Sequence, residues 1–207
     1  VFCQGCPWRC GYCHNPHLQL RGDAGNVAWP AVVERLRRRV GLIDAVVFSG
    51  GEPTIDPALE AAMQQVRALG FAVGLHTAGA YPQRLAQVLR LVDWVGLDIK
   101  APACGYDGIT RVAGSAHNAF ASARLLLESG VAHEFRTTIH PALHSVQDLL
   151  QLAQNLSGMG VRNYALQLFR PTGCTDPALF PVAGGFPGVD LLERIAALFT
   201  TFTLRRA

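Results

Sequence analysis

Short apolar runs rich in β-branched residues alternate along the chain with longer segments whose apolar residues recur every three or four positions. The first pattern is typical of strands and the second of amphipathic helices. Repetition of this strand–helix unit predicts a parallel sheet with right-handed helical crossovers. We expect strands at 1–2 (a stub), 45–49, 71–76, 94–100, 133–140 and 164–169.

Turn and capping residues bound the helices between these strands. Asp56 caps the second helix, Pro57 lies in its first turn, and Gly70 follows its end. Ser145 and Asp148 form a variant of the capping box at the start of the fifth helix. We expect helices at 30–40, between 56 and 70, at 82–92 and 115–129, from 146 onward, and at 189–203.

Two of the expected strands have one polar face. A doubly wound sheet and a barrel or partial barrel both fit the order of elements, but helices on both faces require continuous apolar strands. One polar face therefore favours a curved sheet with helices outside and a polar lumen. Structural pairing of the charges with one another is the alternative explanation. The polar positions are Gly96, Asp98 and Lys100 in one strand, and Glu134, Arg136, Thr138 and His140 in the next.

Composition indicates a single globular domain and argues against nucleic-acid-binding and membrane-spanning proteins. With 207 residues, 50% of them hydrophobic, the chain can form a single domain over 1–207. The net charge of +3 includes no broad basic stripe, so we expect no nucleic-acid partner, and no apolar run is long enough for a membrane span. Clustered cysteines without a secretory signal indicate a reducing cytoplasm. Because the chain begins at Val1 rather than Met, we expect the first strand to be truncated.

Glycine-rich or polar motifs follow the C-terminal ends of the expected strands. Enzymes with α/β folds build their sites at these ends, so the coincidence indicates an enzyme. The motifs are the cysteine cluster, Ser-Gly-Gly-Glu-Pro-Thr at 49–54, His-Thr-Ala-Gly at 76–79, Asp-Ile-Lys-Ala-Pro at 98–102, His-Pro at 140–141 and Arg-Pro at 170–171.

Four of the six cysteines lie between positions 3 and 13. Cys6, Cys10 and Cys13 share one tight loop, where their sulfurs can converge on one metal centre. A structural zinc site is one alternative, although the pairs Cys3-x2-Cys6 and Cys10-x2-Cys13 lie too close for a usual zinc ribbon. A four-cysteine cluster for electron transfer is another, but it leaves the other motifs without a purpose. A cluster with three cysteine ligands keeps one iron open for chemistry.

Two motifs carry a resemblance to a known family. Cys6-x3-Cys10-x-Tyr12-Cys13 resembles the CxxxCxφC signature of the radical S-adenosylmethionine (SAM) enzymes, and 50–53 resembles their GGEP motif. The segment 13–16 resembles the subgroup that activates glycyl-radical enzymes, and the segments 94–102, 134–138 and 167–171 are similar to the activating proteins of anaerobic ribonucleoside-triphosphate reductase. They are less similar to the pyruvate formate-lyase activases. The resemblance covers nearly the whole chain and implies a partial (β/α)6 barrel.

The resemblance also implies cofactors, partners and site residues. A [4Fe–4S] cluster held by Cys6, Cys10 and Cys13 would cleave SAM reductively and produce a glycyl radical on a partner enzyme. We expect anaerobic ribonucleoside-triphosphate reductase as this partner and flavodoxin or ferredoxin as the electron donor. Activation of another glycyl-radical enzyme, or a radical reaction on a small molecule, is the alternative. The implied SAM-site residues are Tyr12, Gly50, Gly51, Glu52, Pro53, Thr77, Asp98 and Lys100, with catalytic roles for Lys100 and Arg136.

Two positions need separate interpretations. Cys3 is expected to be a small buried thiol, because a fourth cysteine ligand would block the open iron. His76 stands where related activases often carry an aspartate that helps to hold a monovalent cation near SAM. Histidine is a poor ligand for such a hard ion, so the cation is either absent or held by another group.

Overall fold

A single parallel sheet forms the centre of the computed structural model, which describes residues 1–22, 25, 27–180 and 185–206. Its seven strands follow one another in chain order from one edge to the other, so β1 and β7 are the edges of an open sheet. Every neighbouring pair is parallel. The strands are β1 (Phe2–Cys3), β2 (Ala45–Gly50), β3 (Ala72–Thr77), β4 (Trp94–Asp98), β5 (Ala132–Ile139), β6 (Asn163–Leu168) and β7 (Thr201–Arg205).

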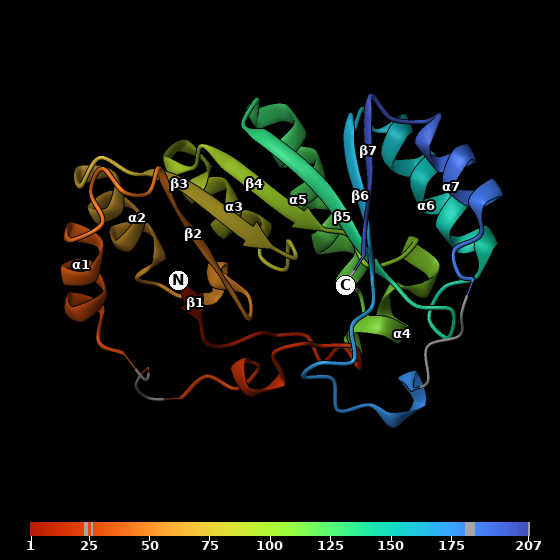
Figure 1. The fold of residues 1–207 in the computed structure, drawn as a ribbon, viewed down its shortest axis with the longest axis horizontal. Coiled ribbons are helices and arrows are strands. Elements are labelled where there is room, and N and C mark those ends of the chain that lie inside the picture. Colours follow the sequence, from red (N-terminus) through yellow and green to blue (C-terminus); the bar gives the residue numbers. More distant parts are fainter. Residues whose placement is uncertain (23–24, 26, 181–184, 207) are drawn as a thin grey trace.

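Helices follow the outer side of the curved sheet, and residues 4–20 cross beneath the ends of the strands (Figure 1). None of the helices in the described part of the chain has the length and hydrophobicity to cross a bilayer. The α-helices are α1 (Trp29–Arg37), α2 (Leu59–Ala68), α3 (Pro82–Val88), α4 (Tyr106–Thr110), α5 (Ser115–Ser129), α6 (Val146–Gly158) and α7 (Val189–Ala196). Short 3-10 turns lie at Pro16–Leu18, Pro53–Ile55, Leu89–Leu91, Ala103–Gly105 and Pro177–Leu179.

The two faces of β4 and β5 differ as the alternation predicts. Leu97 and Phe135 are fully buried on the face toward the helices. On the other face, Asp98 and Arg136 are paired by the strand register and form an ion pair. The expected curved sheet with helices outside is therefore confirmed, and so is the capping box of Ser145 and Asp148 at the start of α6.

The expectation of one helix over 189–203 is wrong. The helix α7 ends at Ala196, and Thr201–Arg205 forms β7, which pairs in parallel with β6. In Thr-Phe-Thr-Leu, β-branched and apolar residues alternate with a period of two, which suits a strand once β6 provides an edge. The additional strand brings Arg205 to the polar face, where its Nη2 donates to Oε2 of Glu134 at 2.8 Å.

Several element ends also differ from those expected. Helix α1 ends at Arg37 rather than at residue 40, and β4 ends at Asp98 rather than at residue 100. Helix α2 begins at Leu59, because the Asp56 carboxylate caps the N–H of Ala58 in a turn that precedes the helix. Asp56 is a capping residue, as expected, but it lies two residues before Ala58, the N-cap of α2.

Candidate functional site

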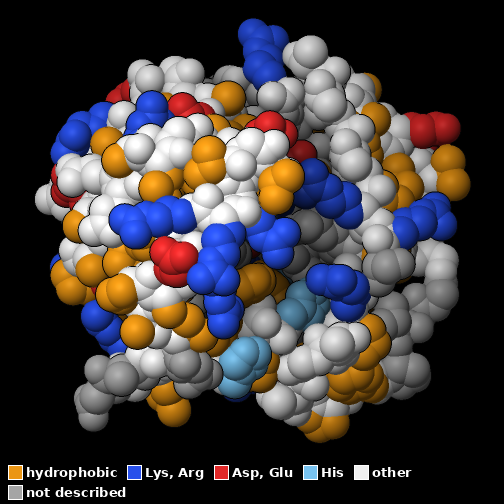
Figure 2. All heavy atoms as spheres, turned by 60° about the vertical axis from the view of Figure 1, so that its left-hand side comes forward, with side chains coloured by type: hydrophobic (Ala, Val, Ile, Leu, Met, Phe, Trp, Pro, Cys, Tyr) orange, Lys and Arg blue, Asp and Glu red, His pale blue; other side chains and the backbone are white. Residues whose placement is uncertain are grey.

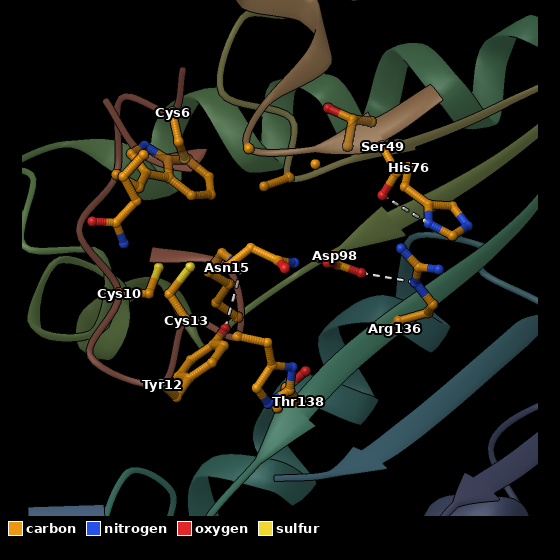
Figure 3. A pocket seen from close by; sticks show the side chains of 18 residues that line it. Cys6, Cys10, Tyr12, Cys13, Asn15, Ser49, His76, Asp98, Arg136 and Thr138 are labelled. Carbon is orange, nitrogen blue, oxygen red and sulfur yellow. Dashed lines mark hydrogen bonds and ion pairs between the residues drawn. The ribbon is translucent and has the colours of Figure 1, made fainter. Parts of the chain in front are cut away.

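A cavity lies between the C-terminal ends of the central strands and residues 5–14, which we name the cysteine loop. Cys6, Cys10 and Cys13 all line it with free thiols. Figure 3 shows the sulfurs of Cys10 and Cys13 directed to the same side of the loop. The other residues that line the cavity are Trp8, Tyr12, His14, Asn15, Gln19, Ser49, Gly50, Gly51, His76, Thr77, Ala78, Asp98, Lys100, Arg136 and Thr138.

Backbone hydrogen bonds hold the cysteine loop from two sides. The N–H of Cys6 donates to the carbonyl of Gln19 at 3.0 Å, next to the 3-10 turn at Pro16–Leu18. The N–H of Arg9 donates to the carbonyl of Thr110 at 2.8 Å, at the end of α4. Since α4 was not among the expected helices, this support could not be foreseen from the sequence.

A third contact comes from the segment after β6. The thiol of Cys174 donates to the carbonyl of Gly11 at 3.3 Å. Gly173 has φ +81 and lies so close to the carbonyl of His14 that a side chain there would collide with backbone. These contacts help to define the shape of the loop.

Gly50 and Gly51 allow the end of β2 to pack directly against the segment that leads into the cysteine loop. The N–H of Gly51 donates to the carbonyl of Cys3 at 2.9 Å. A Cβ atom on Gly51 would lie 2.9 Å from the carbonyl oxygen of Leu18, and one on Gly50 would lie 2.5 Å from the backbone nitrogen of Cys3. Only glycine fits at these two positions.

Lys100 is the only lysine of the chain, and 9% of its surface is exposed. Its ammonium group donates to the hydroxyl of Tyr12 at 3.2 Å and lies 5.3 Å from the centre of that ring and 5.7 Å from the centre of the Trp8 ring. Burial lowers the pKa of Lys100, whereas the negative charge of Asp98 raises it and favours the ammonium form. Lys100 is therefore a buried cation in contact with the cysteine loop.

The backbone of Lys100 is also fixed. The carbonyl of Lys100 lies 2.7 Å from Nε2 of His144, and the carbonyl of Ile99 accepts from the hydroxyl of Thr137 at 2.7 Å. These two contacts hold the segment just after β4, so the position of the ammonium group does not depend on the long side chain alone.

Asp98 and Arg136 form a second charged group in the lumen. Arg136 is 6% exposed, and its Nε donates to Oδ1 of Asp98 at 2.8 Å (Figure 3). Space for the guanidinium depends on Gly96, since a Cβ there would lie 2.8 Å from the guanidinium carbon. The alternative explanation of the polar face is thus partly correct, because these charges do pair with each other.

His76 lies beside this pair. Its Nδ1 is 3.4 Å from the hydroxyl of Ser49, and its ring meets the edge of Trp94 at 5.7 Å between ring centres. Burial, followed by the positive charge of Arg136, lowers the pKa of His76 to about 4. The imidazole is therefore neutral near pH 7 and adds no charge to the cavity.

Glu52 and Pro53 are the two expected cofactor-site residues that do not line the cavity. Both are buried, and Glu52 has no exposed surface. The Glu52 carboxylate points to the end of β3, where it accepts from the hydroxyl of Thr77 at 2.7 Å and from the N–H of Ala78 at 2.8 Å. The Glu52 carboxylate therefore accepts hydrogen bonds from the protein and does not face the cavity.

The donor set fits an iron–sulfur cluster. Burial raises the pKa of the Cys6 thiol to about 11 and raises that of Cys10, so both need a bound metal to become thiolates at neutral pH. In the described residues, no three His, Cys, Asp or Glu side chains are grouped tightly enough to share one metal ion. A cubane takes each thiolate on a different iron, so it does not need such convergence.

Exposed arginines lie around the outer face of the cysteine loop. Arg9 belongs to the loop itself, Arg111 lies over Gly11 and pairs with Asp176 at 3.3 Å, and Arg21 lies against Gly5. Figure 2, viewed with the α1 side turned forward, shows basic side chains around a depression in the surface. Arg21 also pairs with Asp56 at 3.7 Å, so much of this positive charge is offset by neighbouring carboxylates.

Comparison with known proteins identifies the family. The model of the radical SAM superfamily matches residues 1–163. The chain belongs to the radical SAM superfamily. Members of this superfamily use a [4Fe–4S] cluster and SAM, and these are the cofactors of this chain.

Individual relatives of this radical SAM protein extend the comparison. It is 28% identical over 189 residues to a Methanocaldococcus jannaschii protein named as a glycyl-radical enzyme activating enzyme, covering 85% of this chain and 74% of the relative. It is 28% identical over 162 residues to the pyruvate formate-lyase-activating enzyme of Clostridium pasteurianum, covering 75% of this chain and 67% of the relative. The fold matches Streptococcus suis SuiB bound to its precursor peptide SuiA, with TM-score 0.75 and 15% identity over 98% of this chain. The chain spans about half of that structure, 47% of its length.

Some residues that line the cavity were not among the expected cofactor-binding or catalytic residues. Trp8 and Asn15 lie in or next to the cysteine loop, and Thr138 follows Arg136 on the same face of β5. The period of two in β5 was a signal for Thr138. Trp8 had no such signal, because its role depends on Lys100, which is 92 positions away in the sequence.

Proposed function

We propose that this radical SAM protein produces a glycyl radical on a partner enzyme, and that the partner is anaerobic ribonucleoside-triphosphate reductase. The observation that carries the proposal is that the three thiols of the cysteine loop line one cavity with Gly50 and Gly51, Asp98, Lys100 and Arg136. The names of the two curated relatives support the activase reaction. The similarity of 94–102, 134–138 and 167–171 to reductase activators supports the choice of partner.

In this proposal, Cys6, Cys10 and Cys13 hold the cluster, while Cys3 stays outside the ligand set. When bound, the cluster and SAM supply the one-electron chemistry that removes a hydrogen atom from a substrate glycine. Gly50 and Gly51 have no side chains, so they line the cavity with backbone, whose carbonyl groups suit the amino group of SAM. The protein contributes orientation and exclusion of water.

Lys100, Asp98 and Arg136 provide the charged part of the proposed SAM site. A buried ammonium group next to the cysteine loop suits the carboxylate of SAM, and the cavity around it is lined by Tyr12 and Thr77. Arg136 is already neutralised by Asp98, so we assign it to orientation of SAM or of the substrate glycine segment. The neutral His76 leaves no carboxylate for a monovalent cation at its position.

The proposed reaction also requires an electron donor and a reducing environment. Flavodoxin or ferredoxin is the proposed electron donor. The free thiols are compatible with a reducing cytoplasm. We treat residues 1–207 as one radical SAM core domain, because the seven strands form one continuous sheet.

The test is anaerobic activation of purified partners. The reconstituted protein is incubated with SAM, a reductant and anaerobic ribonucleoside-triphosphate reductase, and electron paramagnetic resonance (EPR) is used to look for a glycyl doublet. Cys10→Ala is the inactive control. A doublet on the reductase supports the proposal. Deoxyadenosine release from SAM without a doublet on this reductase would overturn the choice of partner.

A second candidate partner is pyruvate formate-lyase. The specific observation in its favour is the match to the Clostridium pasteurianum activating enzyme over 75% of this chain. Running the same incubation in parallel with pyruvate formate-lyase distinguishes the two. A doublet on neither enzyme, with SAM still consumed, would favour a radical reaction on a small molecule.

A further inference from the structure

We propose that Glu52 is a positioning residue that joins the turn at Gly50 and Gly51, which we name the glycine turn, to the end of β3. Its carboxylate does not contact SAM. The inference depends on the proposed function only for the identity of the cofactor that these backbone turns serve. Glu52 was expected among the cofactor-binding residues, so the structure assigns it a different way of acting.

The first observation is that both oxygens of the carboxylate accept from protein donors. Its Oε1 accepts from the N–H of Thr54 at 3.1 Å, from the hydroxyl of Thr54 at 2.7 Å and from the hydroxyl of Thr77 at 2.7 Å. Its Oε2 accepts from the N–H of Ala78 at 2.8 Å. Oε1 therefore accepts from more donors than its two lone pairs can serve ideally, and Oε2 uses one of its two lone pairs. With no exposed surface and no place in the cavity lining, the Glu52 carboxylate is out of reach of a ligand in the cavity.

The second observation is that Thr77 is committed in the same way. Its hydroxyl donates to Glu52 and accepts from the N–H of Gly79 at 3.0 Å, and only 3% of the residue is exposed. Thr77 therefore reaches the cavity without a free hydroxyl. At Thr77 and Ala78, the polar groups that remain for ligand contact are therefore those of the backbone.

The third observation is that the backbone of Glu52 extends the connection to the cysteine loop. Its N–H donates to the carbonyl of Gly5 at 2.8 Å, immediately before Cys6. One residue thus connects three segments that line the cavity: the cysteine loop through its backbone, its own glycine turn, and the end of β3 through its carboxylate. A buried, fully satisfied polar group of this kind specifies one arrangement of the segments it joins.

Replacement of Glu52 by glutamine keeps the hydrogen bonds to Oε1 and removes the one that Oε2 accepts from Ala78. In Glu52→Gln, Oε1 can keep its three donors, but the new amide NH2 faces the N–H of Ala78, so two donors oppose each other. A buried donor left without an acceptor costs roughly 5- to 150-fold in the equilibrium for local opening. Hydrogen exchange at Ala78 in the protein without cofactor should therefore accelerate by that factor, while exchange in the core of β5 stays unchanged.

The second readout is SAM binding. With the cluster reconstituted, SAM changes the EPR spectrum of the reduced protein, and titration of this change gives an affinity. We expect Glu52→Gln to retain iron at the wild-type level and to bind SAM several-fold more weakly. Thr77→Val should weaken binding similarly, and Thr77→Ser, which restores the hydroxyl, should recover it. The rescue guards against variants that merely misfold.

Two results would overturn the inference. One is wild-type exchange at Ala78 with wild-type SAM affinity in Glu52→Gln, because the connection would then position nothing. The other is loss of SAM affinity with wild-type exchange at Ala78, because the carboxylate would then contact SAM directly. Exchange is measured without cluster, SAM or partner, so a failure of the proposed activase function would not affect this test.

Discussion

Replacing Gly50 by alanine should release the short edge strand β1 and the cysteine loop that follows it. Gly50 has φ +114, a conformation that costs a residue with a side chain roughly 1–3 kcal/mol. The added Cβ would also lie 2.5 Å from the backbone nitrogen of Cys3. Overpacking against such a contact costs about 1–3 kcal/mol. The combined strain is therefore about 2–6 kcal/mol.

The strain has an easy route of relief, because β1 contains only two residues and pairs with β2 at Phe2↔Ser49 and Cys3↔Gly50. We expect β1 to separate from β2 while the core of the sheet stays folded. Gly70→Ala is the matched control: Gly70 has φ +90, but nothing lies within 4 Å of a Cβ built there. It should carry the conformational cost without the collision.

The assay is hydrogen exchange combined with iron analysis after anaerobic reconstitution. The N–H groups of Ser49 and Gly51 donate to the carbonyls of Val1 and Cys3 at 2.8 and 2.9 Å, so they report directly on β1. In Gly50→Ala these two amides should lose protection and bound iron should fall, whereas Gly70→Ala should keep both. Equal protection and equal iron in the two variants would refute the reasoning.

Three further predictions concern the site. Cys3→Ala should retain an iron–sulfur cluster that binds SAM while Cys10→Ala should not, as measured by iron content and EPR; a cluster lost equally from both would contradict the ligand assignment. Lys100→Met removes the ammonium group beside Tyr12 and should weaken SAM cleavage at least tenfold by loss of a charged hydrogen bond of about 1.5–3 kcal/mol; unchanged deoxyadenosine release would exclude Lys100 from the site. The pKa of His76 is lowered to about 4, whereas an unfolded histidine titrates near pH 6.5, so from about pH 6.5 down to 4 only the unfolded chain binds this proton. The free energy of unfolding should therefore fall as the pH is lowered from about 6.5 to 4. Above about pH 6.5, the stabilising contribution of the neutral His76 should be fully present. His76→Asn should flatten the profile in denaturant titrations, and the exposed His117→Asn should not; an unchanged profile in His76→Asn would show that another group causes it.

Much of the fold follows from local patterns. Alternation of Val95, Leu97 and Ile99 with Gly96, Asp98 and Lys100 predicted one apolar and one polar face, and all three apolar residues are buried. The cysteine loop and the glycine turn were identified from spacing within a few residues. Such features depend on neighbours in the sequence, so propensity and period reveal them.

The tertiary structure decided the features that depend on distant partners. Residues 201–205 form a strand because β6 offers an edge, an influence that the local pattern at 189–203 did not contain. The ammonium group of Lys100 meets the hydroxyl of Tyr12 across 88 positions, and the carboxylate of Glu52 turns away from the cavity to donors 25 and 26 positions later. The order and chemistry of the elements were set by the amino-acid sequence over short ranges. Which buried polar group faces a ligand and which faces another part of the protein was set by packing, because each buried group must find its partners within the space that the neighbouring strands leave.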